Sequence, residues 1–287
     1  MRIAQNRIDF PAYNTHGVDV FARPHCALID IYESGDHAHI RGTTTLNRDP
    51  LLLKRLSCVA HALKAIRFDK NPLDKTPLKQ LFAACSVGLD AQSQALTHEL
   101  KGLKSGKDID IHGVDISARF TACAREGYFP IEATDNIPDT WLERIVFDGK
   151  YTNGLRFEDM GITFHDAQDI RDHKERYDIS VVTNVLYHMD KDTAIETMVH
   201  LTGQTSSIIA TDPASIDKHC DDLMPILYRN GFMNLTSLLR QAQNVRPVSA
   251  LRENAESQIF AHVSVARGIV EMCGDKAQPV DFSDFRL

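Results

Sequence analysis

The stretch that decides the fold is residues 81–88, Leu-Phe-Ala-Ala-Cys-Ser-Val-Gly, an apolar run that ends in a glycine. Apolar residues at helical spacing follow over 89–103, and a second apolar run, 109–115, ends in an aspartate. The pattern predicts a strand, a tight turn, a helix and a second strand. In α/β proteins this unit binds a nucleoside-containing ligand, because the glycine lets the backbone approach it and the acidic side chain accepts hydrogen bonds from ribose. The sequence therefore predicts a nucleoside site.

Strand-like apolar runs alternate with helical ones over the rest of the chain. The expected strands are 78–84, 109–114, 161–164, 177–182, 206–211 and 258–266. The expected helices between or after them are 118–125, 193–201 and 221–229. Such alternation is typical of an α/β fold, a mostly parallel sheet with helices on both faces.

Two regions interrupt this alternation. Asp49 can cap a helix that starts at Pro50, and the prolines within 69–77 predict a linker. We therefore expect an N-terminal accessory region, 1–75, in which 26–41 suggests a hairpin, and a ligand-binding domain, 76–287. The interval 127–160 is long for a structureless loop, so we expect an inserted subdomain with a short helix and a hairpin.

Composition excludes several classes of function. The 287 residues carry a formal net charge of -7, which gives no general attraction to nucleic acid or to an anionic membrane. Six scattered cysteines fit free thiols, and no signal peptide or membrane span is apparent, so we expect a cytoplasmic protein. His37 and His39 would share one face of a strand, but without a third ligand they predict no metal site.

Three polar positions should converge where the strands end. The turn 85–88, Asp115 and Asn184 each follow an expected parallel strand. Gly88 lacks the second and third glycines of the dinucleotide fingerprint, which favours S-adenosylmethionine (SAM), a ligand without phosphate, over NAD. Structural roles stay open: an ordinary turn at Gly88, a helix cap at Asp115, and a side chain that ties the turn at Asn184.

The ordered set of motifs resembles a known family, the chemotaxis-receptor (CheR-type) methyltransferases that esterify glutamate side chains. The resemblance lies in Thr-Thr-Thr-Leu-Asn-Arg-Asp-Pro (43–50), Ala-Ala-Cys-Ser-Val-Gly (83–88), Val-Asp-Ile-Ser (114–117), Gly-Tyr-Phe (127–129) and Asn-Val-Leu (184–186). It implies a class I, Rossmann-like methyltransferase fold with a seven-stranded sheet, a small N-terminal region that closes over the ligand, and SAM as the methyl donor.

The resemblance also implies site residues. The donor-binding set would be Thr44, Ala84, Cys85, Gly88, Asp90, Asp115, Ile116, Asp166, Ala167 and Asn184. Within it, Asp115 would take the ribose hydroxyls and Asp166 would face the adenine. Asp90 would replace the family's acidic residue after the glycine, because that position is Leu89 here. The catalytic set would be Arg48, Asn184 and His188.

The acceptor stays open, because the chain departs from the family where an acceptor would bind. Thr183 replaces an arginine and His188 replaces a tyrosine. Arg48 could hold an acceptor carboxylate, which needs no base, whereas His188 could deprotonate an amine, phenol or hydroxyl. A protein carboxylate is the first expectation. A small-molecule O- or N-methyltransferase and a non-catalytic module that binds SAM or S-adenosylhomocysteine (SAH) are the alternatives.

Overall fold

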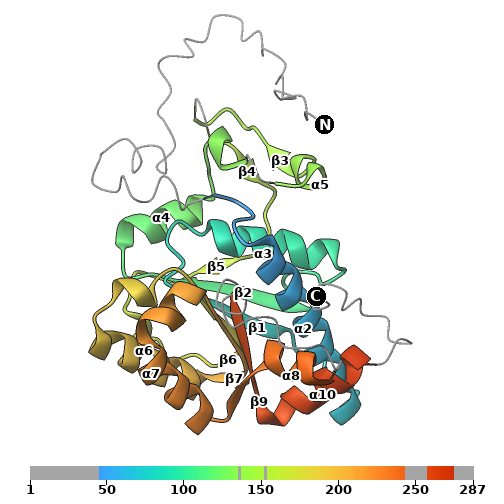
Figure 1. Ribbon diagram of the computed structural model, residues 1–287. Coiled ribbons are helices and arrows are strands. Elements are labelled where there is room, and N and C mark those ends of the chain that lie inside the picture. Colours follow the sequence, from blue (N-terminus) through green and yellow to red (C-terminus); the bar gives the residue numbers. More distant parts are fainter. Residues whose placement is uncertain (1–44, 135–136, 152–153, 243–256, 275–287) are drawn as a thin grey trace, which may run out of the picture.

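A central sheet organises the computed structural model, which describes residues 45–134, 137–151, 154–242 and 257–274. Its strands lie in the order β5-β2-β1-β6-β7-β9-β8 (Figure 1). In chain order they are β1 (Leu78–Ala83), β2 (Ile109–Val114), β5 (Thr163–Phe164), β6 (Tyr177–Val182), β7 (Thr205–Thr211), β8 (Phe232–Asn234) and β9 (Gln258–His262). All neighbours from β5 to β7 pair in parallel, and β9 pairs antiparallel with β7 and β8. The predicted mostly parallel, seven-stranded sheet is confirmed.

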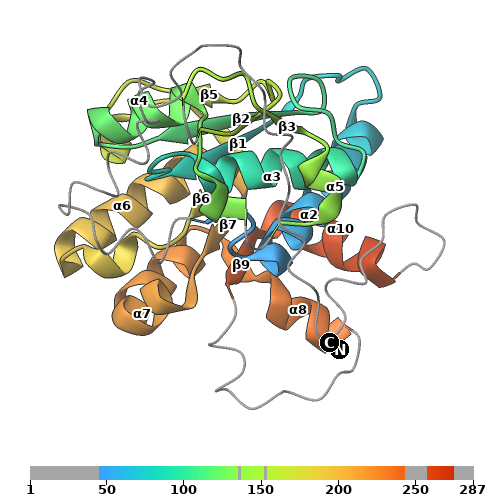
Figure 2. The same ribbon diagram turned by 90° about the horizontal axis from the view of Figure 1, so that it is seen from above.

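Helices cover both faces of the sheet. They are α2 (Pro50–Lys70), α3 (Leu89–Leu100), α4 (Ala118–Glu126), α6 (Lys191–Gln204), α7 (Pro213–Arg229), α8 (Leu235–Ala242) and α10 (Val263–Gly274). The helices α2, α3 and α10 pack together, and α6 packs on α7. Figure 2 shows α2 and α10 on the side opposite α6 and α7.

The strands are buried on both faces, which explains why they appear as continuous apolar runs. In β1, Leu78 and Phe82 join the core beneath α2 and α3, whereas Leu81 and Ala83 join the core beneath α6 and α7. From β1 the chain proceeds through β2 to β5 on one side, and from β6 to β7 on the other. The strand order therefore reverses between β1 and β6, and ligands bind at such a switch point, beyond the carboxyl ends of the strands.

Several expected boundaries need correction. The run 258–266 is not one strand, because β9 ends at His262 and α10 begins at Val263. Helix α7 begins at Pro213, eight residues before the expected start, and the three-residue strand β8 was not predicted. The expected cap of α2 is confirmed, since Asp49 Oδ1 accepts a hydrogen bond from Leu52 N at 2.9 Å. The expected hairpin within 26–41 lies outside the described residues.

The segment after α4 contains a short helix, α5 (Asp139–Leu142), a 3₁₀ turn, η2 (Ile131–Thr134), and a two-stranded antiparallel ladder of β3 (Ile145–Val146) and β4 (Arg156–Phe157). Trp141 of α5 is buried in the larger core. Arg144 Nη1 bonds Glu99 Oε2 of α3 at 2.6 Å, so the segment is anchored to the outside of that helix. Whether it forms a subdomain of its own, and whether a boundary lies near residue 75, stay predictions.

Within the described ranges, no helix is both long and apolar enough to span a lipid bilayer.

Candidate functional site

Backbone strain concentrates at the switch point of the sheet. Four described non-glycine residues have positive φ angles: Asn47 (54°), Ala84 (54°), Ser86 (51°) and Asn184 (60°). Ala84 and Ser86 follow β1, Asn184 follows β6, and Asn47 precedes α2 and donates its N–H to Ser93 Oγ of α3 at 2.9 Å. Residues in this conformation cost about 1 kcal/mol or more and persist where their surroundings enforce them, often at ligand sites.

The turn after β1 is held by Asp115, at the end of β2. Asp115 Oδ2 accepts a hydrogen bond from Ser86 N and Oδ1 accepts one from Ser117 N, both at 2.8 Å. Burial raises the pKa of this carboxyl, although the two N–H donors lower it. Each carboxylate oxygen can accept about two hydrogen bonds, so acceptor capacity remains for hydroxyl groups of a ligand. The cap of α4 is Ser117 rather than Asp115.

Gly88 is required by packing as well as by backbone geometry. It caps α3 with φ = 82°, a left-handed conformation that glycine adopts without strain. A Cβ built there would lie 2.6 Å from Cζ of Phe164 and 3.0 Å from Cβ of Ala124. Any side chain at this position would therefore displace Phe164 of β5, a structural role that the sequence did not indicate.

The other expected donor-binding residues lie around Asp115. Ile116 follows it and is 72% exposed. Asp166 and Ala167 form the loop after β5, and Gln168 N bonds Asp115 O at 3.0 Å, which brings this loop to the end of β2. Asp166 is exposed and pairs with Arg125 at 2.7 Å.

Cys85 is buried, and burial raises the pKa of its thiol, which disfavours the nucleophilic thiolate form.

A cleft of about 220 Å³ opens at the ends of β1, β6 and β7. The described residues that line it are Arg48, Asp49, Leu52, Leu53, Leu56, Phe82, Asp90, Val181, Thr183, Asn184, Asp212, Pro213 and Ser257. Burial raises the pKa of the Asp90 carboxyl, and the nearby Arg48 guanidinium opposes that rise. The cleft thus brings together three residues expected from the sequence, Arg48, Asp90 and Asn184.

Two aspartates that were not expected as site residues also line the cleft. Asp212 Oδ2 accepts hydrogen bonds from Asn184 N at 2.7 Å and from Ser215 Oγ at 2.7 Å. Asp49 Oδ2 accepts one from Ser257 Oγ at 2.6 Å and so joins the start of α2 to β9. The pair Asp212-Pro213 is a typical helix start, and this signal at the end of an expected strand could have revealed Asp212.

His188 lies apart from these residues. It is exposed on the 3₁₀ turn η4 (Leu186–His188), where its ring centroid is 4.0 Å from that of Tyr187. It is not among the described residues that line the cleft. Thr44, the remaining expected residue, lies outside the described residues.

The chain matches the family model "CheR methyltransferase, SAM binding domain" over residues 48–208, more than half of its length. It therefore belongs to the CheR family of methyltransferases. The protein is a SAM-dependent methyltransferase with a class I fold, and SAM is its methyl donor. No curated protein sequence matches the chain.

Solved structures of methyltransferases resemble the chain at low identity. Magnesium protoporphyrin IX methyltransferase (ChlM) from Synechocystis PCC 6803 with bound SAM has 15% identity and a TM-score of 0.40, covering 86% of this chain and 99% of that one. A SAM-dependent methyltransferase from Clostridium acetobutylicum ATCC 824 has 12% identity and a TM-score of 0.32, covering 64% and 55%. Likeness at this level says nothing about the methyl acceptor.

Proposed function

We propose that this enzyme methylates a carboxylate on a protein, a glutamate side chain, and forms a methyl ester. The observation that carries the proposal is that Arg48 lines the same cleft as Thr183 and Asn184. A guanidinium binds a carboxylate through two parallel hydrogen bonds. Among the described residues that line the cleft there is no histidine, lysine, tyrosine or cysteine. This lining suits an acceptor that arrives already ionised.

The residues around β2 fit the donor by their chemistry. Bound SAM supplies an electrophilic methyl group on a sulfonium centre. In the proposed site, Asp115 would accept hydrogen bonds from the ribose hydroxyls with the acceptor capacity its two backbone bonds leave. Ile116, exposed beside it, would cover the adenine together with the 166–167 loop. Asp90 would pair with the methionyl ammonium, which would stabilise the charged form of its carboxyl.

The chemical step would need alignment rather than proton transfer. A carboxylate oxygen of the acceptor forms a bond to the methyl carbon while the carbon–sulfur bond breaks, and the electron pair of that bond stays on sulfur. Arg48 would hold the carboxylate, and Leu52, Leu53 and Phe82 would exclude water from the cleft. Positioning and desolvation together supply most of the acceleration for such a reaction.

A small-molecule O- or N-methyltransferase is the nearest alternative, and it would need a base. His188 is exposed outside the cleft, which weakens that alternative. Asp90 keeps it open, because this carboxyl lines the cleft and burial raises its pKa.

Incubation with methyl-labelled SAM and a cell lysate tests the proposal. We expect label on protein that mild base releases as methanol, since methyl esters hydrolyse under these conditions. Base-stable label on protein, label confined to small molecules, or SAM binding without transfer would each contradict it.

Two variants test whether Arg48 in the cleft is needed for ester formation. Arg48→Gln should lower the rate of ester formation at least tenfold while changing SAH affinity by less than threefold, because the guanidinium contacts the acceptor rather than the donor. Arg229→Gln, an exposed residue at the end of α7, is the matched control and should retain full activity. Equal rates in both variants would remove Arg48 from the acceptor site.

A further inference from the structure

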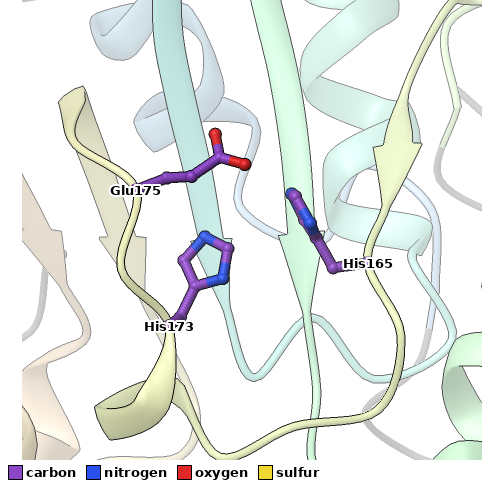
Figure 3. Close-up of side chains that lie close together, drawn as sticks. All are labelled: His165, His173 and Glu175. Atoms are coloured by element: carbon purple, nitrogen blue, oxygen red, sulfur yellow. The ribbon is translucent and has the colours of Figure 1, made fainter.

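A group of polar rings lies in the connection from β5 to β6, away from the cleft. This connection, residues 165–176, contains only the 3₁₀ turn η3 (Ile170–Asp172) and passes β2 and β1 to reach the start of β6. His165 follows β5, whereas His173 and Glu175 precede β6. Figure 3 shows these three side chains pointing toward one another. One potential ligand atom of each lies within 4.8 Å of the others.

Neighbouring groups fix how the imidazoles are presented. His112 Nδ1 of β2 lies 3.0 Å from His165 Nε2, and the two rings stack with centroids 5.2 Å apart. His173 Nε2 lies 2.6 Å from the Tyr177 hydroxyl. Metal-binding histidines are commonly oriented by such partners on the second ring nitrogen. The pair His112 and Tyr177 thus forms an outer layer of the kind that orients metal ligands.

We propose that His165, His173 and Glu175 bind a divalent transition-metal ion of the Zn²⁺ class, which ties the two ends of the 165–176 connection to each other. Two imidazoles and one carboxylate are a donor set that zinc uses with water in the fourth position. The set offers too few oxygens for Ca²⁺ or Mg²⁺. Ligand atoms around tetrahedral zinc lie about 3.3 Å apart, given bonds of roughly 2.0–2.1 Å, so small side-chain rotations would close the site.

The competing interaction in the metal-free protein is weak. Glu175 Oε2 pairs with Lys79 Nζ at 3.2 Å, and these side chains are 42% and 45% exposed. An ion pair this exposed contributes little stability and is easily exchanged for a metal bond. Its exposure also gives an ion a path to the site from solvent. The proposal depends on this cluster alone and is independent of the methyl acceptor.

Titration of the metal-stripped, full-length protein with ZnCl₂ tests the proposal by calorimetry and by thermal unfolding. We expect one ion to bind with micromolar or tighter affinity and to raise the midpoint of unfolding. Glu175→Gln, a conservative change at a partly exposed position, should weaken this binding at least tenfold. The double variant His165→Ala/His173→Ala should abolish it. His262→Ala, on the distant strand β9, is the control and should bind as the wild type does.

Two results would overturn the site. One is the absence of Zn²⁺ binding by the wild-type protein. The other is binding with the same affinity and stoichiometry in Glu175→Gln and in a folded double variant, since the ion would then lie elsewhere in the chain. Circular dichroism shows whether the double variant is folded. If the double variant is unfolded, the Zn²⁺ affinity of Glu175→Gln decides whether the ion binds at this cluster.

Discussion

Two aspartates, Asp115 and Asp212, perform the same task at the ends of two different strands. Each follows a buried parallel strand, β2 or β7, and is itself buried, at 8% and 4% exposure. Each accepts a hydrogen bond from the backbone N–H of a left-handed residue that ends the adjacent strand: Ser86 after β1 for Asp115, and Asn184 after β6 for Asp212. A carboxylate thus enforces the strained turn on either side of the switch point.

Their remaining bonds set the two aspartates apart. Asp212 also accepts from Ser215 N and Ser215 Oγ and caps α7, so three protein donors occupy it. Asp115 accepts one more bond, from Ser117 N, and stands beside the exposed Ile116. The same contact between a carboxylate and a backbone N–H therefore serves two purposes. We interpret Asp212 as a structural support of the cleft and Asp115 as a support that also binds the donor.

The largest effect should come from Asp212→Ala. The change leaves the Asn184 and Ser215 donors without a buried partner and removes the cap of α7. We expect the free energy of unfolding to fall by about 3 kcal/mol, measured by urea denaturation. The matched control is Asp190→Ala, an exposed cap of α6 that accepts hydrogen bonds from the backbone N and the hydroxyl of Thr193, where about 1 kcal/mol should be lost. Equal losses in the two variants would show that Asp212 is merely a cap.

Asp115→Ala should act mainly on ligand binding. We expect it to weaken SAH binding by about 1–3 kcal/mol, roughly fivefold to 150-fold, the usual scale for a lost hydrogen bond to a charged group. It should also cost about 1–2 kcal/mol of stability, because Ser86 N and Ser117 N lose their acceptor. Calorimetry with SAH measures the first effect. Unchanged affinity in the folded variant would remove Asp115 from the donor site and leave it a second structural aspartate.

Lowering the pH should separate the donor-binding role of Asp115 from its structural role. Burial raises the pKa of Asp115 above its ordinary value of 3.8, so the carboxylate that the ribose needs is lost at a higher pH than for an exposed aspartate. Because the folded state then holds this proton more tightly than the unfolded state, its uptake does not destabilise the fold. SAH affinity should therefore decline before unfolding begins as pH falls. Asp115→Asn should bind more weakly, and a pH profile as steep as the wild type's would contradict the assignment.

The smallest effect should follow from Ile116→Ala. Since the side chain is largely exposed, its removal should change the free energy of unfolding by no more than about 0.5 kcal/mol. Covering the adenine would give it a role only in the complex, where we expect a loss of about 1 kcal/mol, roughly fivefold in SAH affinity. Val199→Ala, an exposed apolar residue of α6, should leave both quantities unchanged. If Ile116→Ala also left both the free energy of unfolding and the SAH affinity unchanged, the adenine would have to bind elsewhere.

Much of the fold could be predicted because its signals are local. The bounds of β2 and β6 match the expected 109–114 and 177–182, and the start of α2 follows from Asp49 and Pro50. The failure at 258–266 has an equally local cause, since an apolar run does not distinguish a buried strand from a buried helix. The three-residue strand β8 is too short for any periodicity to reveal it.

The candidate site likewise contains residues that the sequence could predict and residues that it could not. Asp115 and Asn184 could be expected at the switch point because each lies within two residues of the carboxyl end of a strand. Asp212 was not expected, because the helix after β7 was predicted to start at 221, and nothing in the sequence related this residue to Asn184, 28 positions earlier. Likewise, the ligands of the proposed metal site come from both ends of one connection and show no familiar metal-binding spacing.

The sequence alone was enough to predict the alternation of strands and helices from β1 to α7, the glycine turn after β1 and the acidic end of β2, because hydrophobic periodicity and turn chemistry act between near neighbours. Only the tertiary structure decided which carboxylate supports which turn, that Phe164 excludes a side chain at Gly88, and that Arg48 shares a cleft with Asp90 while His188 stays outside. The reason is physical: packing of parallel strands joins residues that are distant along the chain, and no local pattern records which of them meet.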